Sequence, residues 1–327
     1  MYAEYKLEGV KMIEFYPEGK LIDKVQNISS LASRSTLEEA LINKKILESR
    51  ALICDSEHNL IVDLGIMKGI IPREEGAIGI KEGSVRDIAV ISKVNRPVCF
   101  VIERFEKDEF GKDIAILSRR KAQEICMQNY IFNLHPGDII PAKVTHMENF
   151  GVFADIGCGI VSFLPIDTIS VSRISHPNER FSVGMDIKVI IKYFEGNRVH
   201  LTHKELLGTW EENASMFSIG ETVGGIVRSV EEYGIFVELT PNLAGLAEPK
   251  ENVKVGSQAS VYIKNIVPSK MKVKLVIIDT FDYIEMQPKV KYFYQGNHID
   301  KFLYSPPGSS KLIQTDFQAF SDVYTVV

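Results

Sequence analysis

One sequence pattern occurs twice in this chain, and it constrains the fold more than any other feature. The first copy starts at Gly137, and the second starts 83 residues later, at Gly220. Each copy has a leading apolar strand, followed by an aromatic residue, a glycine, a β-branched residue and a phenylalanine. A fixed repeat of a strand–bend–strand pattern predicts a small β domain that has been duplicated.

A third, diverged copy precedes these two. Residues 48–54 and 59–64 are apolar strand candidates, and the segment Val62–Gly65 matches Ala154–Gly157. The aromatic pair is absent, because the equivalent stretch reads Glu-His-Asn-Leu-Ile over residues 57–61. This repeat is therefore expected to be mainly structural.

The chain is accordingly divided into repeats, connectors and flanking segments. The three repeats are assigned to residues 45–121, 136–207 and 218–280. Helical periodicity after the first repeat and around the single tryptophan of the chain predicts helical connectors over 122–135 and 208–217.

The two ends of the chain differ from the repeats. Residues 1–44 are expected to hold a strand near 11–16, a linker over 29–35 and a short helix capped by Thr36. The tail, residues 281–327, contains ten aromatics, whereas disordered tails are poor in them. We therefore predict that the tail folds onto the third repeat. Its hairpin is expected to pair residues 290–294 with 299–304 around the turn at 295–298.

Composition limits the classes of function. The net charge is −5, so a nucleic-acid role must rest on a local surface and on stacking rather than on a strongly basic chain. No apolar run approaches the ~18 residues of a membrane span. The four cysteines lack CxxC spacing, which favours a reduced, cytoplasmic protein without zinc. Cys158, in a Gly-Cys-Gly turn, is expected to be exposed.

The repeated aromatics are candidates for base stacking. Phe150 and Phe153 in one copy correspond to Tyr233 and Phe236 in the other. Strand alternation alone sends residues i and i+3 to opposite faces, so that one ring would fill the barrel. Gly151 marks a bend at which side-chain direction is reset, and both rings can then project outward.

Basic residues of the second repeat are candidates for contacts with phosphates. Lys143 lies between apolar residues and is expected to face outward. Arg198 and His200 share one face by alternation, on a strand expected to neighbour that of Lys143. For each residue alone a solvated charged face is the simpler interpretation, but cations and rings on one small barrel favour binding of single-stranded nucleic acid.

No combination of residues points to catalysis. The sequence has no glycine-rich phosphate loop, nucleophile elbow or HExxH motif, and each repeat offers only a lone carboxylate beside its aromatics. Four further histidines have no metal spacing, and most of them are interpreted as surface residues: His135, His146, His176 and His203. We expect no enzyme activity, no cofactor and no small-molecule substrate.

Taken together, these motifs resemble the S1 domain, an RNA-binding repeat. The resemblance spans about residues 45–280 and is carried by the Gly137 and Gly220 copies and by the closing strands at 116–120 and 198–202. It implies a mainly β chain of tandem five-stranded barrels of the oligonucleotide-binding type, joined by short helices and followed by an aromatic-rich β extension. It also implies single-stranded RNA as the partner. The whole chain is similar to short, three-repeat homologues of ribosomal protein S1 from Gram-positive bacteria.

The resemblance carries site residues over to specific positions. The second repeat supplies Lys143, Phe150, Phe153 and Arg198, with His200 beside them, and the third retains Tyr233 and Phe236. The family histidine is replaced by Pro165 and Glu248, and Ile226 stands where the second repeat has Lys143. One working RNA surface, one weak one and one structural repeat are thus expected.

Alternatives in other functional classes stay open from the sequence. The chain can be an RNA-binding protein of translation or RNA metabolism that associates with the ribosome or with RNA-processing proteins. It can instead be an accessory subunit of an RNA-processing complex, or a protein-interaction scaffold whose barrels no longer bind RNA. The acidic net charge and the replaced histidines favour the scaffold.

Overall fold

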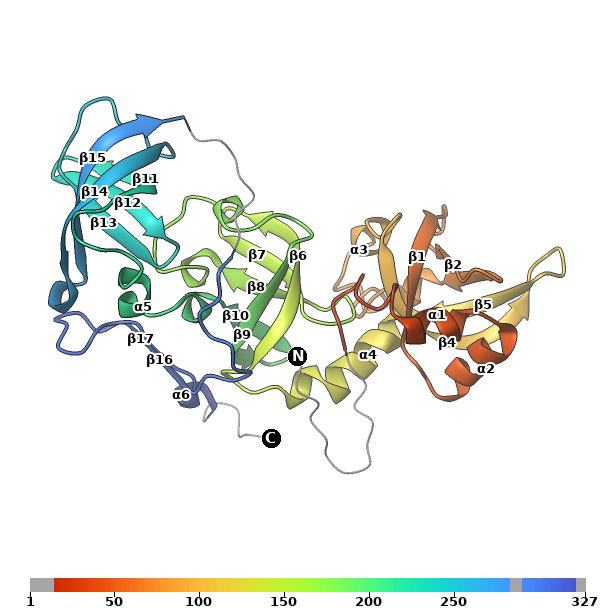
Figure 1. Cartoon of the computed structure of the whole chain (residues 1–327). Coiled ribbons are helices and arrows are strands. Elements are labelled where there is room, and N and C mark those ends of the chain that lie inside the picture. The colour runs from red at the N-terminus through yellow and green to blue at the C-terminus, as the bar shows by residue number, and fades with distance from the viewer. Residues whose placement is uncertain (1–14, 283–289, 322–327) are drawn as a thin grey trace. The chain divides into compact units, whose positions relative to one another are not determined.

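The computed structural model describes residues 15–282 and 290–321. They form two compact units. The first unit ends at Leu134 and also includes Asp155–Val161, and the second comprises His135–Ala154 and the residues from Ser162 onward. Three closed five-stranded barrels account for most of the chain (Figure 1). The predicted mainly β architecture is therefore confirmed, whereas the strand expected at 11–16 lies almost entirely outside the described residues.

The first barrel belongs to the first unit. Its strands, in their order around the barrel, are β1 Leu47–Cys54, β2 Leu60–Asp63, β3 Lys68–Ile71, β5 Asp113–Ser118 and β4 Pro97–Lys107. All neighbours are antiparallel except β3 and β5. Alternate residues of each strand fill the core, as shown by Leu60, Val62 and Leu117, which are fully buried.

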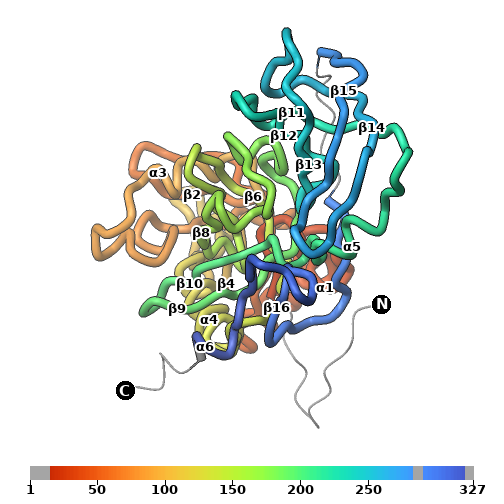
Figure 2. Tube along the Cα trace, turned by 90° about the vertical axis from the view of Figure 1, so that its left-hand side faces the viewer, coloured from red at the N-terminus to blue at the C-terminus, as the bar shows by residue number. Residues whose placement is uncertain are grey.

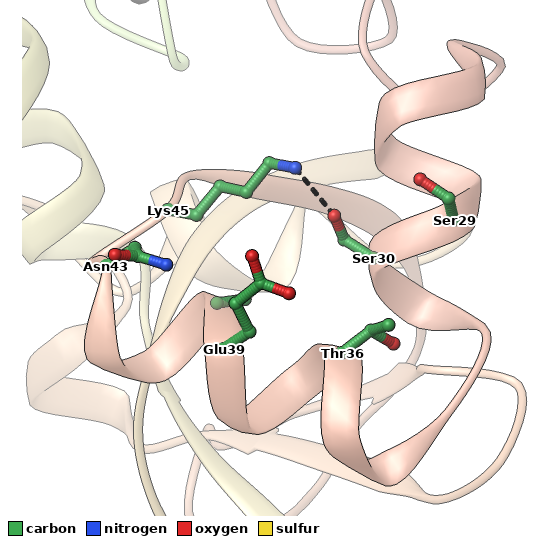
Figure 3. Close-up of a pocket in the computed structure, with 7 residues that line it drawn as sticks. Ser29, Ser30, Thr36, Glu39, Asn43 and Lys45 are labelled. Atoms are coloured by element: carbon green, nitrogen blue, oxygen red, sulfur yellow. Dashed lines mark hydrogen bonds between the residues drawn. The ribbon is translucent and has the colours of Figure 1, made fainter.

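Short helices flank this barrel. They are α1 Val25–Leu31, α2 Arg34–Ile42, η1 Arg73–Glu75, α3 Ile88–Ile91, α4 Arg119–Asn129 and η2 Ile131–Asn133. The segment predicted as a linker lies partly in α1. Ser33, rather than Thr36, caps α2, and Thr36 completes a capping box with it. Figure 3 shows a polar depression between α1 and α2, where Lys45 Nζ donates a hydrogen bond of 2.7 Å to Ser30 Oγ.

A buried charge network lies within the first unit. The Arg119 guanidinium is 2% exposed and binds Glu18 through Nε at 2.6 Å, and Lys93 Nζ lies 2.7 Å from the same carboxylate. Burial by itself raises the pKa of Glu18, but the two cations outweigh it and lower the pKa to about 2. Burial and the charge of Glu18 raise the pKa of Asp155 to about 7. Cys158, predicted to be exposed, is buried beside this network because its loop, Asp155–Val161, packs within the first unit.

The second and third barrels repeat the same strand order. The second contains β6 Ile139–Glu148, β7 Gly151–Asp155, β8 Val161–Pro165, β10 Arg198–Thr202 and β9 Asp186–Glu195. The third contains β11 Thr222–Glu231, β12 Gly234–Thr240, β13 Leu243–Ala247, β15 Lys272–Phe281 and β14 Gln258–Val267. The short helices of these repeats are η3 Ile166–Thr168, η4 Pro177–Glu179, η5 Lys204–Leu207, α5 Trp210–Ala214 and η6 Pro268–Lys270.

The tail folds, but not by the predicted pairing. Its strands β16 Lys301–Leu303 and β17 Gln314–Asp316 are antiparallel, and α6 Gln318–Ser321 follows them (Figure 2). The hairpin predicted between 290–294 and 299–304 is wrong, because residues 290–300 hold no strand. Phe293 instead donates its N–H to the Leu206 carbonyl.

The tail also contacts more than the third repeat. Ile139 of β6 donates its N–H to the Asn297 carbonyl at 2.8 Å, so the tail reaches the second barrel. Trp210 of α5 donates its N–H to the Tyr304 carbonyl at 3.0 Å. Phe317 is fully buried in the core that the tail shares with the connector and the third barrel. The tail is therefore an integral part of the second unit.

Candidate nucleic-acid interface

The aromatic pair of the second barrel lies on its outer face. Phe153 lies between Val152 and Ala154, which are both fully buried, so its own side chain points outward. Phe150 precedes β7 and is 57% exposed, and the two ring centroids are 6.3 Å apart, edge to face. The expectation from simple alternation, that one ring fills the barrel, is thus wrong.

The glycine between the two rings, Gly151, lets β7 approach β8 closely. A Cβ atom at Gly151 would collide with the Leu164 carbonyl oxygen of β8, so no larger residue fits. Gly234 has the same role in the third barrel, where a Cβ would come within 2.6 Å of the Ala247 carbonyl oxygen. The repeated glycine therefore marks a close approach of two strands, next to which the aromatic pair projects outward.

Two further rings join the pair. Phe163 of β8 lies 5.3 Å from Phe153 and 5.7 Å from Phe150, and His146 of β6 stacks on Phe153 at 6.0 Å, all between ring centroids. The sequence analysis missed Phe163. Alternation in β8 could have revealed it, because Ser162 and Leu164 on either side of it are buried.

The row of rings continues onto β10 and β9. His200 is the register partner of Phe163 and stacks on Tyr193, with centroids 4.3 Å apart and planes at 15°. We call the six outward rings, one from each of the five strands and Phe150 from the turn before β7, the ring band: His146, Phe150, Phe153, Phe163, His200 and Tyr193. The band presents π-faces and ring edges across the outside of the sheet, a surface suited to stacking bases.

The predicted cations are less concentrated than expected. Lys143 of β6 and Arg198 of β10 lie on strands that are not neighbours, since β9 separates them, so the expectation of adjacent strands is wrong. Both face outward, but each has an acidic register partner, Asp186 for Lys143 and Glu195 for Arg198. Glu195 Oε2 also lies 3.1 Å from His200 Nε2. Each of the two predicted cations is therefore offset by a carboxylate on the neighbouring strand.

The third barrel carries a smaller version of this surface. Tyr233 is 68% exposed and lies 6.2 Å from Phe236 between ring centroids. The next positions in register hold Leu246 and Lys274, where the second barrel has Phe163 and His200. Two rings and an exposed lysine thus replace the longer band. Lys274 is not among the residues predicted from the sequence, because only the order of the strands brings it beside Leu246.

In the first barrel the same row is aliphatic. Register pairs join Ile53 to Ile61, Ile61 to Ile70, and Ile70 to Ile116. Isoleucine side chains have no π-face on which a base can stack. The positions equivalent to the ring band therefore carry no ring in the first barrel, and they supply matched control positions for the other two.

His203 does not belong to the interface. It was interpreted as a surface histidine, but it is 1% exposed and lies between Phe181 and Tyr292. Its Nδ1 hydrogen-bonds the Ile169 carbonyl at 2.8 Å, and burial lowers its pKa to about 4. His203 is thus a neutral residue of the core.

Among residues 15–282 and 290–321, no group of three or more His, Cys, Asp or Glu side chains is placed to hold a metal ion. In the same part of the chain no helix has the length and apolar character needed to cross a membrane.

The fold and the ring band place the protein in a class: tandem barrels of the oligonucleotide-binding type that carry aromatic rings on the outer face. Residues 134–204 match the family described as the S1 RNA binding domain. The second barrel is therefore an S1 domain.

Its similarity to known proteins extends beyond that domain. Small ribosomal subunit protein bS1 of Staphylococcus aureus strain COL is 27% identical over 312 residues, which cover 88% of this chain and 77% of that protein. The bS1 protein of Staphylococcus haemolyticus is 25% identical, with 88% and 76% covered. A solved multidomain protein with nucleic acid binding domains from Streptococcus pneumoniae is 14% identical, with 73% of this chain and 75% of that chain covered and a TM-score of 0.24.

Proposed function

We propose that this protein binds single-stranded RNA with little sequence preference, mainly on the ring band of its second barrel. One observation carries the proposal: outward rings from all five strands form a row over which successive bases can stack. Every base has a π-face, so a stacking surface does not select sequence. The bases of a duplex are already paired and stacked, so a duplex should bind poorly.

The charges on the outer face of the second barrel also support binding by stacking. Lys143 and Arg198 each face an acidic partner across the strands, so phosphate attraction is a minor part of the affinity. A working site that depends on stacking agrees with the net charge of −5. We propose the seven residues assigned from the sequence as contacts, together with four found in the structure: His146, Phe163, Tyr193 and Lys274.

The similarity to bS1 extends the proposal to the ribosome. Those relatives are named as proteins of the small ribosomal subunit, and they match 88% of this chain. We propose that the protein associates with ribosomes and acts on messenger RNA in translation, without catalysing a reaction. A scaffold or an accessory subunit with degenerate barrels is not favoured, because the second barrel retains both the match to an RNA-binding domain and its rings.

Fluorescence anisotropy of the full chain tests this function. A labelled single-stranded oligonucleotide and the same sequence in duplex form are titrated at two salt concentrations. We expect the single strand to bind at least tenfold more tightly, the equivalent of one stacked base. Equal or tighter binding of the duplex would contradict a stacking surface. Co-sedimentation with 30S subunits tests the ribosomal association separately.

A further inference from the structure

The ring band does not end within the second barrel. Phe320 of α6 lies 5.7 Å from Tyr193 of β9 between ring centroids, with the planes at 31°. Tyr193 already stacks on His200 at 4.3 Å. Two rings therefore lie against Tyr193, one from its own barrel and one from the tail. The backbone of α6 runs close to β9 (Figure 2).

The tail is built to hold Phe320 at this position. Three residues earlier, Phe317 is fully buried, and its N–H donates to the Asp300 carbonyl at 2.9 Å. Gln318 Nε2 donates to Asp300 Oδ1 at 3.1 Å, and the Phe320 N–H closes the turn onto the Phe317 carbonyl at 3.1 Å. Phe320 is therefore held over the barrel by a short turn whose base is anchored in the core.

An aromatic ring seated on a stacking surface occupies the space that a base would take. Tyr193 can stack on a base only over the part of its ring that His200 and Phe320 leave uncovered. The turn that carries Phe320 is only four residues long, Gln318–Ser321, so a base can displace it without unfolding β16 or β17.

We propose that Phe320 acts as a base mimic, and that α6 and single-stranded RNA compete for Tyr193. This inference rests on the proposed function, and it adds a regulatory role for the tail. RNA that reaches Tyr193 must first displace Phe320. The tail thus lowers the affinity of the second barrel for single-stranded RNA.

Removing the competing ring tests the inference. The affinity of the full chain for a labelled oligouridylate of about ten nucleotides is compared with that of Phe320→Ala and Phe320→Leu. The contact between Phe320 and Tyr193 is expected to change the equilibrium constant for displacement of α6 by about two- to tenfold. Both variants lack this contact, so the Kd for RNA should fall by that factor. Leu312→Ala, an exposed position elsewhere in the tail, should leave the affinity unchanged.

A second readout detects the displacement directly. Chymotrypsin cleaves after exposed aromatic residues, so RNA should accelerate cleavage after Phe320 in the wild-type chain. Unchanged or weaker RNA binding by both variants, or protection of Phe320 by RNA, would overturn the competition while leaving RNA binding itself intact. A wild-type chain that binds no single-stranded RNA would overturn the proposed function as well.

Discussion

Replacing the aromatic pair of the second barrel should weaken RNA binding more than the equivalent change in the third. The double variant Phe150→Ala/Phe153→Ala removes the rings that β7 contributes. Phe153 is central to the ring band, since it lies within 6.0 Å of His146 and within 5.3 Å of Phe163. Its loss therefore divides the band as well as removing one stacking position.

The magnitude follows from the number of bases that the two rings can hold. Stacking is worth ~1–3 kcal/mol per base as judged by alanine substitution. Even if the pair accommodates a single base, the loss is about 1.4 kcal/mol, or tenfold in Kd. We expect at least this loss for Phe150→Ala/Phe153→Ala. A smaller loss is expected for Tyr233→Ala/Phe236→Ala, because Leu246 and Lys274 leave that pair without further rings beside it.

Fluorescence anisotropy with a single-stranded oligouridylate measures the two losses under identical conditions. Ile61→Ala is the matched control, because Ile61 occupies the equivalent row of the first barrel and should not contact RNA. Thermal unfolding of each variant checks that the barrels remain folded. Equal losses from the two double variants would refute the ranking, and a loss of similar size from Ile61→Ala would refute the assignment of the stacking surface.

Three further outcomes are expected. The salt dependence of RNA binding should be shallow: roughly two to four phosphate contacts per barrel give a log–log slope of about −1.4 to −2.8, and a slope steeper than about −5 would reveal an unrecognised basic surface. Because the folded-state pKa of Glu18 is lowered to about 2, its ion pair with Arg119 contributes stability above the unfolded-state pKa near 4.5 and loses it as the pH falls toward 2. Thermal unfolding of the first unit between pH 6 and pH 3 should therefore be less pH-dependent in Glu18→Gln, and an unchanged dependence would contradict the shift. Phe317→Ala should lower the free energy of unfolding of the second unit by about 3–5 kcal/mol. A variant that unfolds at the same temperature as the wild-type chain would show that the tail does not stabilise this unit.

The sequence of each repeat was enough to predict the unit from which this protein is built, a small β domain. The repeated glycine between two aromatics predicted a bend, and the structure shows a close approach of strands at Gly151 and Gly234 for which no side chain has room. Alternation of apolar residues is a local property, since successive side chains of a strand point to opposite faces. Together with the repeat it predicted a duplicated small β domain, whereas the barrel form came from the resemblance to S1 domains. Applied to β8, alternation would also have placed Phe163 on the outer face.

The assembled interface depended on the tertiary structure, because residues far apart in sequence meet only when a barrel closes. The strand order separates Lys143 from Arg198 and brings His200 beside Phe163, although nothing local distinguishes these neighbours from others. The same holds for the tail, whose Phe320 reaches Tyr193 across more than a hundred residues. A hairpin turn specifies pairing only between adjacent segments, whereas these contacts are fixed by the shared core that the tail forms with the connector and the third barrel.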